Sequence, residues 1–124
     1  MWREELPEQC PPNNAFPPQV DSTFFRLISE IPAKESDFDS HRKLSPEKPF
    51  NTSECIARSL SIIDTKANAE LLRKSAYLKD KKLAEVKMNS SSGLILKNGK
   101  AAGHHSWWIP SSLSPLDLIV SHYA

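Results

Sequence analysis

The stretch GHHSWWIP, residues 103–110, holds two of the three Trp residues and two of the four His residues of the chain. If it forms an extended strand, successive side chains point to opposite faces. One face then carries His104, Ser106 and Trp108, and the other carries His105, Trp107 and Ile109. We expect one face to belong to the core and the other to form a contact surface or a site.

Further segments on both sides of this stretch have the character of strands. Aromatic and β-branched residues dominate two of them, and apolar and charged residues alternate in a third. A fourth ends in Asn98-Gly99, a pair favoured in tight hairpins. With a last candidate near the end of the chain, the predicted strands are 23–28, 59–63, 84–88, 93–100 and 116–120.

One segment, about 65–79, has clear helical spacing. Its apolar residues recur on one side while Lys66, Glu70 and Arg73 take the other, and Asp64 or Thr65 is placed to cap its start. Strands with a single such helix predict an α+β fold. We expect a small, twisted, largely antiparallel sheet with one principal helix packed on it.

The 124 residues are expected to form one domain, 1–124. Five of the ten Pro residues lie in 1–20, which predicts an extended arm, and Trp2 and Phe16 are apolar enough to dock it on the body. Residues 21–124 are then the α+β core. The polar stretch 31–54 predicts a long loop, and long loops often cover or line a site.

The balance of 16 basic and 15 acidic residues gives no long-range field toward a nucleic acid or an anionic membrane. The basic turn at residues 79–82, with the Trp pair, could bind a single strand, but such turns usually complement a helix C-terminus. Neither nucleic acid nor membrane is therefore expected as a partner. The N-terminus shows no apolar signal sequence, so we expect a cytoplasmic protein.

The two Cys residues, Cys10 and Cys55, could pair, but free thiols are expected because no export signal is present. A nucleophilic pair of Cys55 with His105 is conceivable, although Cys55 between apolar neighbours is better explained as a small core residue. No metal site is expected. His104 and His105 point to opposite faces of a strand, and neither a C-x-x-C nor an H-x-x-x-H spacing occurs.

Residues 23–75 resemble ADP-ribosyltransferase-like and related NAD-consuming toxin domains, through FFRL at 24–27 and RSLSI at 58–62 followed by a helix. The resemblance implies that Arg26 meets the NAD diphosphate and that Ser61 supports the nicotinamide ribose. These families place a Glu or another polar catalytic residue on a late strand. The chain departs from them there, since residues 94–109 contain no acidic residue and only His104 or His105 could stand in.

Two functions follow from these patterns. The first is a small cytoplasmic binding or regulatory module without a cofactor, which contacts a protein partner through Trp107, Trp108 and the loop 31–54. The second is an ADP-ribosyltransferase-like enzyme acting on NAD or a related nucleotide. For the enzyme, Arg26, Ser61 and one His must converge on one cleft. If they do not, Arg26 is a surface cation and Ser61 a strand hydroxyl.

Overall fold

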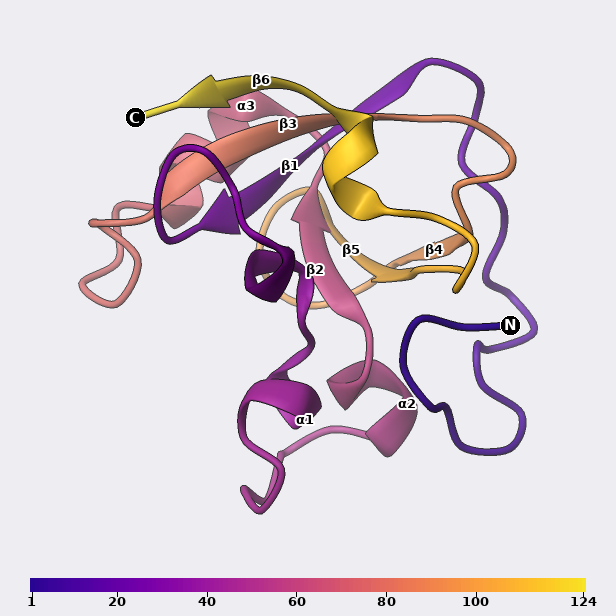
Figure 1. Cartoon of the computed structure of the whole chain (residues 1–124). Helices are drawn as coiled ribbons and strands as arrows, with labels where there is room; N and C mark the ends of the chain where they lie inside the picture. Colours follow the sequence, from indigo (N-terminus) through magenta and orange to yellow (C-terminus); the bar gives the residue numbers. More distant parts are fainter.

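The computed structural model describes all residues, 1–124, as an α+β fold built on one six-stranded antiparallel sheet (Figure 1). The expected fold class is confirmed at this level. The order of strands across the sheet is β4-β5-β2-β1-β3-β6. The strands are β1 (Ser22–Ile28), β2 (Leu60–Ile63), β3 (Lys82–Met88), β4 (Leu94–Lys97), β5 (His104–Trp108) and β6 (Ile119–Tyr123).

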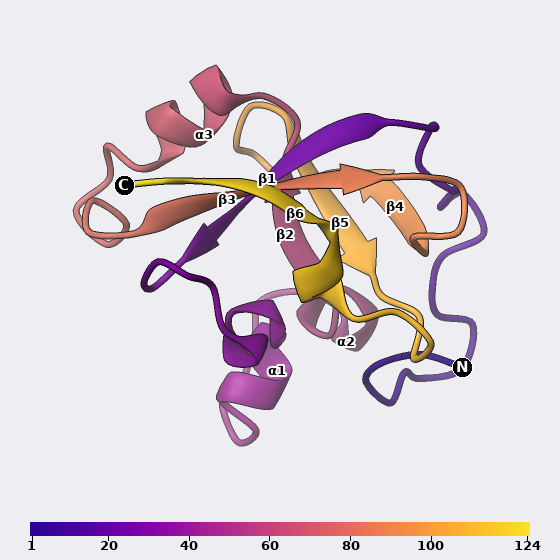
Figure 2. The same ribbon diagram turned by 45° about the horizontal axis from the view of Figure 1, so that its top comes forward.

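The helices are short, and α3 packs on one face of the sheet. In Figure 2, α3 lies above the strands and α1 and α2 lie below them. The α-helices are α1 (His41–Leu44), α2 (Glu54–Ala57) and α3 (Lys66–Leu72), and the 3₁₀ helices are η1 (Glu35–Phe38) and η2 (Pro115–Leu118). Ser and Thr side chains cap α1, α2 and α3 by accepting a backbone N–H of the first turn.

The two faces of the sheet carry separate apolar clusters. Phe24, Ile62, Val86 and Trp107 belong to the larger cluster, which Phe38 of η1 closes. The smaller cluster, on the other face, consists of Phe25, Ile63, Ala69 and Leu83, and it is covered by α3. Both faces therefore carry buried apolar side chains, and the buried polar side chains between the clusters need partners within the fold.

β1 and β2 pair at only one position, Phe25 opposite Ile63, so the two strands diverge beyond it. The side chain of Arg26 fills this gap. Its Nη1 donates to the Ser61 carbonyl at 2.9 Å. It takes the place of the backbone N–H of β1 that would bond to this carbonyl if the two strands continued to pair. The divergence of the strands thus places a cation between them.

Three predicted element boundaries are wrong. The helix expected over 65–79 ends at Leu72. Residues 74–77 after it are exposed, and the Arg73 side chain bonds to Glu70 and to the Lys81 carbonyl. Pro115 begins η2, so the last strand runs over Ile119–Tyr123 instead of 116–120. The loop between β4 and β5 covers residues 98–103 and is no two-residue turn.

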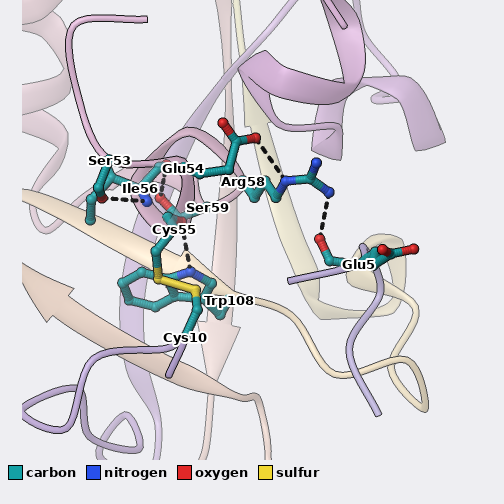
Figure 3. The surroundings of a disulfide bond; sticks show 9 residues. All are labelled: Glu5, Cys10, Ser53, Glu54, Cys55, Ile56, Arg58, Ser59 and Trp108. Atoms are coloured by element: carbon teal, nitrogen blue, oxygen red, sulfur yellow. Dashed lines mark hydrogen bonds and ion pairs between the residues drawn. A yellow bond between two sulfur atoms is a disulfide. The ribbon is translucent and has the colours of Figure 1, made fainter. Parts of the chain in front are cut away.

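Cys10 and Cys55 form a disulfide, so the expectation of free thiols is wrong (Figure 3). Their Cα atoms lie 5.6 Å apart, within the usual range for such a bond. The bond joins the N-terminal segment, residues 1–20, to α2. The same segment pairs with the sheet at two isolated bridges, Trp2 with Pro110 and Phe16 with Ile95.

Trp107 and Trp108 are both buried, with 0% and 1% of their surface exposed, and this corrects the expected aromatic contact surface. The Trp107 indole N–H donates to the Ser92 carbonyl. The Trp108 indole N–H donates to the Cys55 carbonyl, beneath the disulfide (Figure 3). Alternation along β5 was predicted correctly, but both of its faces are covered.

Candidate active site

A pocket of about 380 Å³ opens on the face of the sheet that carries α3. Its polar lining comes from five separate segments. These residues are Arg26 of β1, Ser61 of β2, His104 of β5, His41 of α1 and Lys81, which directly precedes β3. Apolar walls include Ile63, Leu72 and Leu78. Its volume is in the range of small-molecule sites. The hollow beneath the N-terminal segment, lined by both Trp residues of β5, holds only about 10 Å³.

Arg26 is a cation with no ion pair. Its Nε donates to the Asp37 carbonyl and its Nη1 to the Ser61 carbonyl, both at 2.9 Å. Burial lowers the pKa of Arg26 to about 10, although the charges of Asp37 and Asp39 oppose this shift. The guanidinium is therefore charged at neutral pH. Its Nη2 makes no hydrogen bond with the protein, and Arg26 lines the pocket. A guanidinium with an unused N–H group is suited to bind an anion in that pocket.

Ser61 and His104 come together through the register of β2 and β5. Ser61 lies opposite Ser106, and Ile63 lies opposite His104. Opposite residues of an antiparallel pair share a face, so Ser61 and His104 are diagonal neighbours on the pocket side. The His104 Nε2 and the Ser61 Oγ are 2.9 Å apart.

The hydrogen bonds of His104 fix its tautomer. Its Nδ1 lies 2.8 Å from the backbone carbonyl oxygen of Asn98, which can only accept, so Nδ1 carries the proton. In the neutral ring Nε2 is then unprotonated and accepts a hydrogen bond from the Ser61 hydroxyl. A histidine placed in this way takes a proton from the serine oxygen, as in activated-serine enzymes.

The loop between β4 and β5 holds the imidazole in place. The Ser106 hydroxyl donates to the Asn98 Oδ1, which also lies 3.1 Å from the His104 Nδ1. Gly99 has a φ of +81°, and a Cβ there would come within 2.8 Å of the same nitrogen. The Asn98-Gly99 pair, predicted as a hairpin turn, therefore also supports the site.

The second histidine of the pair, His105, is not part of the pocket. Its ring packs edge-on against Phe24 at 5.1 Å, on the opposite face of the sheet, and its Nδ1 contacts the Gly103 carbonyl. Because Cys55 is in a disulfide, the conceivable nucleophilic pair with His105 does not exist. Of the four candidate catalytic residues, the pocket brings together Arg26, Ser61 and His104.

His41 was not singled out from the sequence. It belongs to the stretch 31–54, and together with Leu44 it lines the pocket. Burial lowers the pKa of His41, and the charges of Arg26 and Lys48 lower it further. His41 is therefore neutral at pH 7 and offers a neutral hydrogen-bonding group beside the cation. In the structure Ser40 caps α1 and so fixes the position of His41, the first residue of that helix.

No family model, curated protein or solved structure matches this chain. The resemblance to NAD-consuming domains is thus neither supported nor opposed by relatives. No group of three His, Cys, Asp or Glu side chains is placed to hold a metal ion. None of the helices has the length and apolar character needed to cross a bilayer.

Proposed function

We propose that this pocket is the active site of a small transferase or hydrolase acting on NAD or a related nucleotide. The observation that carries the proposal is the convergence of Arg26, Ser61 and His104, from three strands, on one pocket. Arg26 binds the diphosphate through its free Nη2. The apolar walls contact the base of the nucleotide.

In the proposed reaction the bond between the ribose C1′ and the nicotinamide nitrogen breaks, and the nicotinamide leaves with the bonding electron pair. A hydroxyl of water or of an acceptor forms the new bond to C1′. Its proton passes to the Ser61 Oγ as the Ser61 proton moves to the His104 Nε2. The pocket lining contains no carboxylate, so His104 takes the catalytic position that an acidic residue has in the families this chain resembles.

The binding-module hypothesis loses the aromatic part of its contact surface, because Trp107 and Trp108 are buried, and keeps only the segment 31–54. A protein partner would have to contact another part of the molecule. The disulfide argues against the expected cytoplasmic location, since disulfides are rare in the cytosol. The geometry therefore favours the enzyme over the binding module.

The test is release of nicotinamide from NAD by the purified protein, with water alone and with protein and nucleic-acid acceptors. Ser61→Ala and His104→Gln should each slow release about 100-fold or more, the usual contribution of a positioned proton acceptor. Arg26→Gln should weaken binding of ADP-ribose about 10- to 100-fold. Ser112→Ala, at an exposed position outside the pocket, is the matched control for Ser61→Ala. Failure of the wild-type chain to bind ADP-ribose or to release nicotinamide with any acceptor overturns the proposal.

A further inference from the structure

The loop between α3 and β3 and the first residue of β3, together residues 73–82, concentrate positive charge in a chain that is nearly neutral as a whole. We call this segment the basic loop. This basic loop holds five of the 16 cationic residues and one acidic residue, so its net charge is +4. The rest of the chain carries a net charge of −3. The overall charge of +1 therefore conceals a strong local asymmetry, and the field near this loop attracts anions.

Most of this charge is not used within the fold. Arg73 is bound to Glu70 and to the Lys81 carbonyl. The remaining four cations make neither an ion pair nor a side-chain hydrogen bond; they are Lys74, Lys79, Lys81 and Lys82. All four line one open hollow of about 400 Å³. Four unpaired ammonium groups around one hollow suit a ligand with several negative charges.

The basic loop also presents an aromatic ring to solvent. Tyr77 is 94% exposed, the highest value among the large apolar and aromatic side chains. Turn hydrogen bonds hold the backbone around it, from the Leu78 N–H to the Ser75 carbonyl and from the Lys81 N–H to the Leu78 carbonyl. An exposed ring beside unpaired lysines is the combination that binds single-stranded nucleic acids, since the ring stacks on a base while the lysines neutralise phosphates.

The basic loop lies at the candidate active site. Leu78 and Lys81 line the pocket of Arg26, Ser61 and His104, and Lys81 also lines the basic hollow. We infer that the basic loop binds a single-stranded nucleic acid across the entrance of this pocket. This deepens the proposed function and rests on it in one respect: a hydroxyl of the strand is the acceptor that bonds to C1′ and gives its proton to His104 through Ser61.

Binding is tested on the full chain without NAD, by the fluorescence anisotropy of labelled single strands of about 12 nucleotides, a length that one such surface covers. Tyr77→Ala should weaken binding roughly 5- to 100-fold, while Tyr77→Phe retains it. Between about 50 and 200 mM salt, log K should fall with log salt by about 0.7 for each phosphate contact. Lys74→Gln with Lys79→Gln should therefore reduce that slope by about 1.4.

The matched control is Lys34→Gln with Lys87→Gln, which removes the same two charges at exposed positions elsewhere and should bind as wild type. Absence of oligonucleotide binding, or equal binding by Tyr77→Ala, overturns the inference. Equal competition by a poly-glutamate peptide also overturns it, because the loop would then recognise acidic protein segments. The Lys74/Lys79 variant should release nicotinamide into water at the wild-type rate, because neither residue lines the pocket. Loss of strand binding with normal nicotinamide release is therefore distinguishable from failure of the proposed enzyme.

Discussion

At the scale of single residues, the site depends on polar groups that the fold orients from outside the pocket. Asp37 is the best example. Its carbonyl accepts from Arg26, and its carboxylate accepts from the Ser29 N–H, the Ser29 hydroxyl and the Lys34 N–H. The end of β1, the start of η1 and the pocket cation are thus joined through one residue. Arg26 is held in place by this network and keeps one nitrogen free.

Asp37→Asn should destabilise the protein at neutral pH and much less in acid. Burial opposes ionisation of Asp37, but the hydrogen bonds from Lys34 and Ser29 and the charge of Arg26 outweigh it and lower its pKa below 3.8. A lowered folded-state pKa contributes stability that is present above 3.8 and is lost as the pH falls through the folded-state value. Urea unfolding should show a loss of about 1 kcal/mol at pH 7.

Asp80→Asn, at an exposed residue without a side-chain hydrogen bond, is the control and should change little at any pH. A loss for Asp37→Asn that stays constant down to pH values well below 3.8 would contradict this account.

At the scale of elements, the sequence predicts what depends on local periodicity. Residue composition, alternation and turn residues placed five of the six strands within a few residues. Alternation along the His-Trp stretch separated His104 from His105 correctly. It could not show that the helix ends at Leu72, because helical spacing does not reveal where the sheet beneath it ends. Nor could it show that both faces of β5 are covered, since this depends on segments distant in sequence. For the same reason the sequence could not show that His41 lines the pocket.

Trp107→Ala and Trp108→Ala should therefore both cause large losses of stability, about 3–5 kcal/mol each. Each indole is buried and its N–H is bonded to a backbone carbonyl, so truncation leaves a cavity and an unpaired acceptor. Chemical unfolding measures the loss, and Trp→Phe variants, which keep most of the ring, should lose less if the Ala variants fail to fold. If the free energy of unfolding of Trp108→Ala lies within about 1 kcal/mol of wild type, Trp108 is not packed in the core, and this account is contradicted.

At the scale of the whole molecule, two ends of the fold are fixed by different means. The pocket end, between α1, α3 and the loop after β4, is held by hydrogen bonds around Arg26 and His104. The opposite end is held by the N-terminal segment, through its bridges to Pro110 and Ile95 and through the disulfide to α2. The N-terminal segment also reaches the pocket end, because the Glu4 carboxylate accepts from the Ser40 N–H and hydroxyl at the start of α1. The disulfide itself lies outside the pocket lining.

Reducing the disulfide should lower stability and leave the pocket intact. The bond links residues 45 positions apart, and closing a loop of that length removes about 4 kcal/mol of chain entropy from the unfolded state. Urea unfolding with reductant, and the Cys10→Ser/Cys55→Ser variant without it, should both show a loss of about 2–4 kcal/mol. Reductant should not affect the double variant further.

Because Cys10 and Cys55 do not line the pocket, ADP-ribose binding below the unfolding transition should be unchanged. An equal unfolding midpoint in the presence and absence of reductant would show that the N-terminal segment is held by its other contacts alone.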